Sequence, residues 1–269
     1  MRQIPYLAVA LLLAAVPAGA QVVTLDDALF AGLQPVTVAQ TPDVVYSKDV
    51  RYTAYPLAQV LVEAYPDWKR LIERDAVLIM RASGGYEPFM LFSEAFAGRA
   101  FVAVSLAGRM PDDPYDCWTE GGEQHCDLGY FVIWTDGLYP DRPQPWGTYE
   151  LEVVRYEDAF GDTIPVSDDA AVHAGYTLYK QYCIECHRIN FQGGRKATDH
   201  VVRGAPLTRE LLDFFVRDYR KANPATYMPD FGEVLSAEQV DALYRYIRHM
   251  SENQNLCRDA DRDPRCPAG

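Results

Sequence analysis

Apolar residues recur at helical spacing in three segments of the C-terminal part of the chain. The first stripe repeats every three or four residues: Val172, Gly175, Tyr176, Tyr179 and Cys183. Ser167 precedes this stripe, and we expect its side chain to cap the helix, with Asp168 and Asp169 in the first turn. The pattern predicts an amphipathic helix that buries one face.

Two further helices are predicted downstream. Thr208 is expected to begin the second helix and Asn223-Pro224 to end it. Its apolar stripe consists of Leu211, Leu212, Phe215 and Tyr219. Ser236 and Gln239 form a capping box for the third helix. The stripe of that helix consists of Val240, Leu243, Tyr244 and Ile247.

The N-terminal part mixes helical and strand periods. A helical period over residues 57–74 is interrupted by Pro66. Strand-like apolar runs follow at residues 77–80, 101–106 and 130–134. Residues 149–156 alternate, with Glu150 and Glu152 on one face, which predicts a strand with one solvated face.

Composition and charge change together in the polar segment 162–169. Residues 21–165 contain 10 Lys plus Arg and 23 Asp plus Glu, whereas residues 166–269 contain 14 and 15. We therefore expect a multidomain chain, with an α+β domain at residues 21–165, an all-α domain at residues 166–253 and a polar tail at residues 254–269.

The balance of residues also limits the function. The chain has 269 residues, of which 49% are hydrophobic, enough to bury a core and to exclude a disordered chain. A net charge of −13 argues against nucleic acid, which selects clustered Lys and Arg. Partners are expected to be neutral or basic. Electrostatic steering of a basic partner should act through the acidic residues 21–165.

Residues 1–20 have the three parts of a secretory signal peptide. Arg2 precedes an apolar run, and the small residues Ala18 and Ala20 stand before Gln21. We expect cleavage after Ala20 and export to an oxidising compartment, the periplasm. The apolar run is shorter than the roughly 20 residues that cross a bilayer, and no later segment is predicted to span a membrane.

The segment Cys183-Ile184-Glu185-Cys186-His187 carries the clearest chemistry. Two thiols three residues apart, followed at once by a histidine, form the attachment pattern of a c-type haem. The thiols would add to the two vinyl groups, and His187 would ligate the iron. A zinc half-site would need a second pair of ligands nearby, and a thioredoxin-like pair would need a βαβ context. The motif therefore predicts one covalent haem c.

The sixth iron ligand has two candidates. Met228 lies in a Pro-flanked segment between the second and third predicted helices and belongs to no periodic apolar face. A thioether ligand raises the reduction potential, which suits an electron carrier. His200, also in a predicted loop, is the competitor. His173 and His249 are expected on helix surfaces.

Residues 166–250 resemble a class I c-type cytochrome. The matching elements stand in the order of that family: Gly175, Leu178-Tyr179, Cys183 to His187, Tyr227-Met228-Pro229-Asp230-Phe231, Leu235-Ser236 and Tyr246-Ile247. The resemblance implies the cytochrome c fold, with the first and last helices crossing at Gly175 near Tyr246. It also implies one haem with His187 and Met228 as axial ligands, and one-electron transfer with redox partner proteins.

Four cysteines remain after the haem motif. Cys117, Cys126, Cys257 and Cys266 allow three pairings. Proximity along the chain favours Cys117 with Cys126 and Cys257 with Cys266, which agrees with export. The second pair would clip the tail at residues 254–269.

Residues 55–158 resemble the molybdopterin-binding domain of sulfite-oxidase-like proteins. The matching pieces are the helix at residues 57–63, Gly84-Gly85-Tyr86, and the strand at residues 129–134 ahead of Trp146. That family holds molybdenum through a Cys thiolate, but the only candidates here, Cys117 and Cys126, are assigned to each other. We therefore interpret this domain as a relative that has lost the cofactor and serves docking or substrate contact.

Two main hypotheses follow for the whole chain. The first is a periplasmic electron carrier whose acidic domain positions the haem domain against a redox partner. The second is an enzyme, or an enzyme subunit, that oxidises a small substrate at molybdenum and passes the electrons to its own haem. A haem sensor would need an open or labile sixth position.

Overall fold

The computed structural model describes residues 20–41, 49–74, 76–106, 118–120, 123–125, 130–135, 144–201, 207–226 and 228–253. The predicted signal peptide, apart from Ala20, and the tail at residues 254–269 lie outside these ranges. So do the four cysteines of the predicted disulfides, Cys117, Cys126, Cys257 and Cys266.

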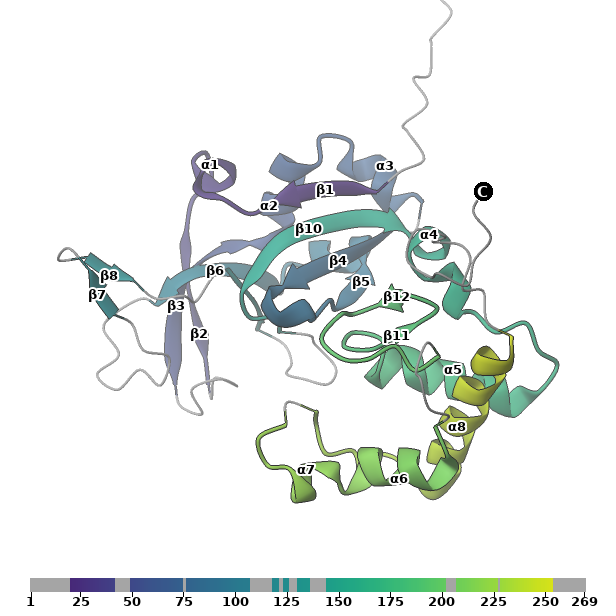
Figure 1. Cartoon of the computed structure of the whole chain (residues 1–269). Helices are drawn as coiled ribbons and strands as arrows, with labels where there is room; N and C mark the ends of the chain where they lie inside the picture. The colour runs from purple at the N-terminus through teal and green to yellow at the C-terminus, as the bar shows by residue number, and fades with distance from the viewer. Residues whose placement is uncertain are drawn as a thin grey trace, which may run out of the picture.

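The described residues of the N-terminal region form two antiparallel four-stranded sheets (Figure 1). The first sheet has the order β1-β10-β4-β5, and the second sheet has the order β2-β3-β6-β9. Their strands are β1 Gln21–Thr24, β2 Val36–Gln40, β3 Val50–Pro56, β4 Ala76–Ala82, β5 Phe89–Leu91, β6 Ala100–Leu106, β9 Phe131–Trp134 and β10 Thr148–Arg155. A separate hairpin joins β7 Trp118–Glu120 to β8 Glu123–His125.

Short helices connect these strands. They are α1 Asp27–Phe30, α2 Leu57–Ala64, α3 Trp68–Ile72, the 3-10 turns η1 Ser83–Gly85 and η2 Phe92–Ala97, α4 Tyr156–Phe160 and the 3-10 turn η3 Gly161–Thr163. The predicted interruption at Pro66 is confirmed, because α2 ends at Ala64 and α3 begins at Trp68. The mixture of sheet and helix predicted for this region is also confirmed.

Strand β4 is buried on both faces. Successive side chains of a strand point to opposite sides, and here Leu78 and Met80 enter a core with α2, while Val77 and Ile79 enter another cluster. That second cluster consists mainly of residues from the C-terminal helices. The continuous apolar run of β4 therefore reflects two covered faces, as in other strands buried on both sides.

Strand β10 corrects the expectation of a half-solvated strand. Glu152 is only 8% exposed, because the C-terminal region covers this face of the first sheet. The Arg81 Nε group donates to the Glu152 carboxylate at 3.0 Å, so the buried charge is paired. The alternation of polar and apolar residues correctly assigned the residues of β10 to its two faces. It did not indicate that the C-terminal region covers the face that carries Glu152.

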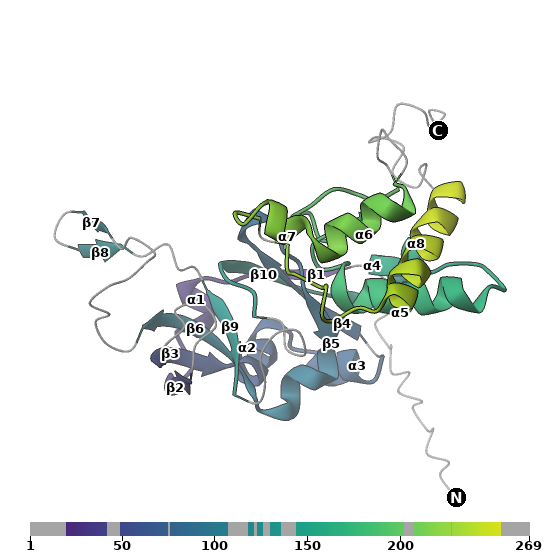
Figure 2. The same ribbon diagram turned by 90° about the horizontal axis from the view of Figure 1, so that it is seen from below.

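Among the described residues from 164 to 253, the C-terminal region contains four helices and a small hairpin. The helices are α5 Ala170–Tyr182, α6 Arg209–Arg217, α7 Tyr219–Ala222 and α8 Ala237–Glu252, and the hairpin pairs β11 Arg188–Ile189 with β12 Gln192–Gly193. The region is thus helical with a two-stranded hairpin rather than purely α. Figure 2 shows these helices on one side of the first sheet, with α2 and α3 on the other.

The helix caps agree with the sequence at two of three positions. Thr208 accepts a hydrogen bond from the Leu211 amide, and Ser236 forms the predicted capping box. The cap of α5 is Asp169, which accepts from the Ala171 amide at 2.8 Å, and not Ser167. The Ser167 hydroxyl instead accepts from the Asp169 amide, so it supports the capping residue.

The predicted apolar stripe of α6 is rotated. Leu211 is 36% exposed, whereas Leu212 and Val216, four residues apart, are buried. Tyr219 belongs to a separate helix, because Asp218 leaves the helical conformation. On α8 the buried face includes Tyr246, which the predicted stripe omitted.

Helices α5 and α8 cross at Gly175, as the cytochrome resemblance implied. A Cβ atom at Gly175 would lie 2.0 Å from the Ala242 carbonyl oxygen and 2.7 Å from Tyr246 Cβ. Only glycine lets the two helices approach this closely. The Tyr246 hydroxyl donates to the Thr163 carbonyl at 2.7 Å and so joins α8 to the end of the N-terminal region.

None of the helices in the described ranges is long and apolar enough to cross a membrane.

Candidate haem-binding site

The attachment motif forms a turn directly after α5. The apolar stripe predicted Cys183 on the first helix, but α5 ends at Tyr182 and Cys183 caps it. The Cys186 and His187 amides both donate to the Cys183 carbonyl, at 3.1 and 2.8 Å. This tight turn brings the two thiols, which are both free and partly buried, and the His187 ring together.

A backbone carbonyl determines the tautomer of His187. Its Nδ1 atom lies 3.0 Å from the Thr198 carbonyl oxygen. A carbonyl can only accept, so Nδ1 carries a proton, and in the neutral imidazole Nε2 then carries the lone pair that a metal requires. This is the arrangement by which an outer hydrogen bond orients a metal-ligating histidine.

Gly193 and Gly194, which belong to none of the predicted motifs, pack directly against the backbone of the turn. A Cβ atom at Gly193 would lie 2.3 Å from the His187 carbonyl oxygen, and one at Gly194 would lie 1.9 Å from that of Glu185. Gly193 also has a φ of +117°, which favours glycine. The pair Gly193-Gly194 soon after the motif is the sequence signal for this close packing.

The surroundings of the turn favour neutral side chains. Burial raises the pKa of the Cys183 thiol to about 12 and that of Cys186 to about 11. Burial also raises the pKa of the Glu185 carboxyl group to about 7, although a hydrogen bond from the Tyr86 hydroxyl opposes the shift. That hydrogen bond is 2.7 Å long and comes from the N-terminal region.

The segment around Met228 is held against the same cluster as the attachment turn. The partly buried Met228 packs against the cluster that also includes Cys183. Phe231, three residues later, contacts the Tyr182 ring, with centroids 5.8 Å apart. The end of α5 and the methionine segment are therefore neighbours.

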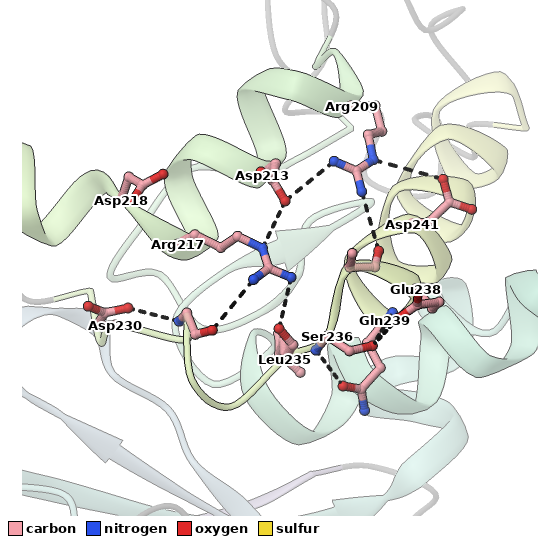
Figure 3. A network of polar contacts seen from close by, with 12 residues as sticks. Arg209, Asp213, Arg217, Asp218, Asp230, Leu235, Ser236, Glu238, Gln239 and Asp241 are labelled. Atoms are coloured by element: carbon pink, nitrogen blue, oxygen red, sulfur yellow. Dashed lines mark hydrogen bonds and ion pairs between the residues drawn. The ribbon is translucent and has the colours of Figure 1, made fainter.

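Arginine contacts stabilise the loop that follows Met228 (Figure 3). Arg217 donates to the carbonyl oxygens of Gly232 and Leu235, at 3.5 and 3.0 Å, and to Asp213 at 2.9 Å. The Phe231 amide donates to the Val216 carbonyl at 3.1 Å. These contacts attach the loop, from Phe231 to Leu235, to the C-terminal end of α6.

His200 lies beside His187 and not opposite to it. The two rings stack with centroids 4.2 Å apart, and the His200 amide donates to the Arg188 carbonyl at 2.9 Å. If His187 held a haem iron, the other protein ligand would have to come from a different side of the site, which His200 does not occupy. The expected surface position of His173 agrees with its exposed ring, which contacts the Ser167 carbonyl.

The donor set fits a c-type haem. Two free thiols, a histidine with its Nε2 lone pair and a thioether from a neighbouring loop are the groups that such a haem uses. Cys183, Cys186 and His187 come from one turn, and Met228 comes from the segment packed on the same cluster.

Comparison with known proteins agrees with this chemistry. The family model of cytochrome c oxidase, cbb3-type, subunit III matches residues 170–247. These residues are therefore a c-type cytochrome segment, and they bind a c-type haem covalently.

One curated relative is the quinohemoprotein alcohol dehydrogenase ADH-IIG of Pseudomonas putida. It is 31% identical over 81 residues, which cover 30% of this chain and 11% of that protein. The chain thus matches about a tenth of the length of that relative. No solved structure matches the chain.

Proposed function

We propose that the chain is a periplasmic electron-transfer protein with one haem c. In this proposal Cys183 and Cys186 form the thioether bonds, and His187 and Met228 are the axial ligands. Residues 166–253 form the cytochrome domain, and residues 21–165 form an acidic domain for partner docking. The haem, when bound, supplies one-electron exchange between ferric and ferrous iron.

The observation that carries the proposal is the orientation of His187. Its Nδ1–H group is held by the Thr198 carbonyl in the turn that contains both free thiols. Such an outer hydrogen bond fixes the ring and makes the other nitrogen a better ligand.

The positions of the two side chains favour Met228 over His200 as the sixth ligand. His200 stacks on the His187 ring and so lies on its side of the site. Met228 belongs to a separate loop that Arg217 and Phe231 attach to α6. A thioether ligand raises the potential and leaves no open coordination position, which suits a carrier rather than a sensor.

Replacement of the two candidates tests the ligand assignment. In the oxidised holoprotein, Met228→Ala should abolish the weak red absorption band that the cytochrome resemblance implies for a thioether ligand. His200→Ala is the matched control and should retain it. Loss of the band in His200→Ala alone would overturn the assignment to Met228.

The second candidate function is a redox enzyme or an enzyme subunit that delivers substrate electrons to its own haem. It is favoured by the match to a quinohemoprotein alcohol dehydrogenase and by the packing of the N-terminal sheet on the cytochrome segment. Metal analysis of the purified protein separates the two candidates. One iron per chain without molybdenum would contradict the molybdenum form of the enzyme, and stoichiometric molybdenum would contradict the carrier.

A further inference from the structure

The segment from Gly85 to Glu87 lies directly against the haem-attachment turn, although it belongs to the N-terminal sheet region. The Tyr86 hydroxyl donates to the Glu185 carboxylate at 2.7 Å. The Glu87 amide donates to the Glu185 carbonyl at 2.9 Å. Both contacts are made to Glu185, one of the two residues between the haem cysteines.

The same segment also binds residues 195 and 196, which follow the β11–β12 hairpin and lie next to the attachment turn. The Arg195 amide donates to the Gly85 carbonyl at 2.7 Å, and the Arg195 Nε group donates to the Glu87 carboxylate at 2.6 Å. The ammonium group of Lys196 lies 5.5 Å from the centre of the Tyr86 ring. Residues 85–87 thus contact two segments of the site. The first segment, residues 183–187, is contacted at Glu185, and the second, residues 194–198, is contacted at Arg195 and Lys196.

Gly85 is required for this close approach. A Cβ atom there would lie 2.6 Å from the Arg195 carbonyl carbon and 2.8 Å from the Lys196 nitrogen. Both are backbone atoms, so no side-chain rotation can relieve the overlap. The φ of Gly85 is +80°, which also disfavours other residues.

Residues 195 and 196 are linked to His187 through the two residues that follow them. The Ala197 amide donates to the Cys186 carbonyl at 2.9 Å, and the next residue, Thr198, provides the carbonyl that holds His187 Nδ1. A displacement of residues 195 and 196 would therefore move the acceptor of the His187 hydrogen bond.

We propose that Gly85 and Tyr86 are positioning residues for the haem ligand His187, through which the N-terminal region sets the reduction potential. The inference rests on the proposed ligation by His187. A hydrogen bond from Nδ1–H to a carbonyl makes the imidazole a stronger electron donor to the iron and so stabilises the ferric state. Loosening residues 194–198 weakens this bond and raises the potential.

A pair of glycine variants tests the proposal in the full-length holoprotein. Gly85→Ala should shift the ferric–ferrous equilibrium toward ferrous iron by about threefold to tenfold, where tenfold is 59 mV for one electron. Gly98→Ala is the matched control, because Gly98 has a φ of +76° but nothing within 4 Å of its Cβ position. Its potential should equal that of the unmodified protein in a spectroelectrochemical titration.

A second pair removes the hydrogen bond without changing any charge. Tyr86→Phe is made in a Glu185→Gln background, in which the carboxylate is already neutral, and compared with Glu185→Gln alone. We expect the added substitution to raise the potential by a smaller factor, up to about threefold, because the turn loses one anchor. This pair remains informative if Gly85→Ala does not fold.

The outcomes separate the inference from the proposed function. If Gly85→Ala, or the Tyr86→Phe pair, loses stability while the potential stays unchanged, the residues are merely structural and the inference is wrong. If His187→Ala leaves the haem spectrum unchanged, the proposed ligation itself is wrong. A normal His187-dependent spectrum with raised potentials supports both.

Discussion

The two faces of the first sheet are covered in different ways. The inner face packs against α2 and the second sheet, and its central residues Leu78, Met80 and Leu151 are wholly apolar and unexposed. The outer face packs against the C-terminal helices and combines apolar residues with the partly buried pair of Arg81 and Glu152. The inner face is thus the core of one region, and the outer face is a junction between two.

The difference shows how a junction keeps a fixed geometry. Apolar contacts alone allow neighbouring layers to slide, whereas paired charges and main-chain hydrogen bonds specify one arrangement. Across the junction, the Glu87 amide donates to the Glu185 carbonyl and the Arg195 Nε group donates to the Glu87 carboxylate. Within the sheet, Arg81 donates to both Glu87 and Glu152 and so holds Glu87 in place. The haem-attachment turn is therefore held at a defined position on the sheet.

The largest expected effect comes from a cavity in the inner face. Leu78→Ala should lower the free energy of unfolding by about 2–5 kcal/mol, because the closely packed core cannot collapse into the space. Its neighbour Val77 points to the outer face, and Val77→Ala removes two carbons, worth about 1–2 kcal/mol. Urea denaturation followed by circular dichroism measures both. Leu78→Ala removes three carbons and Val77→Ala two, so equal losses per carbon removed would mean that the two faces do not differ as cores.

The next largest effect tests whether the ion pair of Arg81 and Glu152 stabilises the outer face. Arg81→Met or Glu152→Leu alone should lower the free energy of unfolding by about 1.5–3 kcal/mol, since each leaves a partly buried charge without its main partner. The double variant should recover much of the loss, because the closest pair is removed as a whole and Glu87, another partner of Arg81, keeps Arg195. A double-mutant cycle in thermal unfolding measures the coupling.

A control distinguishes this pair from ordinary surface charges. Arg248 and Glu252 form an exposed ion pair on α8 at 2.8 Å, and such pairs contribute about 0–1 kcal/mol. The same cycle at these positions should give a much smaller coupling. If the coupling at Arg81 and Glu152 is no larger, the outer face is not specified by charge.

Local signals in the sequence predicted much of the C-terminal region. Cys183, Cys186 and His187 lie within five residues, so their spacing alone indicates haem attachment. The capping box at Ser236 and the cap at Thr208 are also confirmed, because capping depends only on residues three positions apart.

Features that depend on distant parts of the chain were not predicted. The burial of Glu152 arises because the C-terminal region covers β10, and no pattern within β10 reports that cover. The contact of Tyr86 with Glu185 joins residues 99 positions apart. The apolar residues of α6 lie on several faces, so the choice of Leu212 over Leu211 as the buried position is made by tertiary packing.

The smallest expected effect compares one buried hydroxyl on each face. Tyr65 donates to the Leu151 carbonyl on the inner side, and Tyr246 donates to the Thr163 carbonyl at the junction, both at 2.7 Å. Burial raises the pKa of both phenols, so both remain protonated donors. Tyr65→Phe and Tyr246→Phe should each lower the free energy of unfolding by about 0.5–1.5 kcal/mol.

The probes used for these two variants test whether the junction joins the regions into one unit. Because the outer cluster contains residues of both regions, we expect haem absorbance and far-ultraviolet circular dichroism to report one coincident transition. Each variant should then move both signals together. If Tyr246→Phe moves only the haem signal and Tyr65→Phe only the dichroism, the outer face would be a weak docking surface, and the two regions would unfold independently.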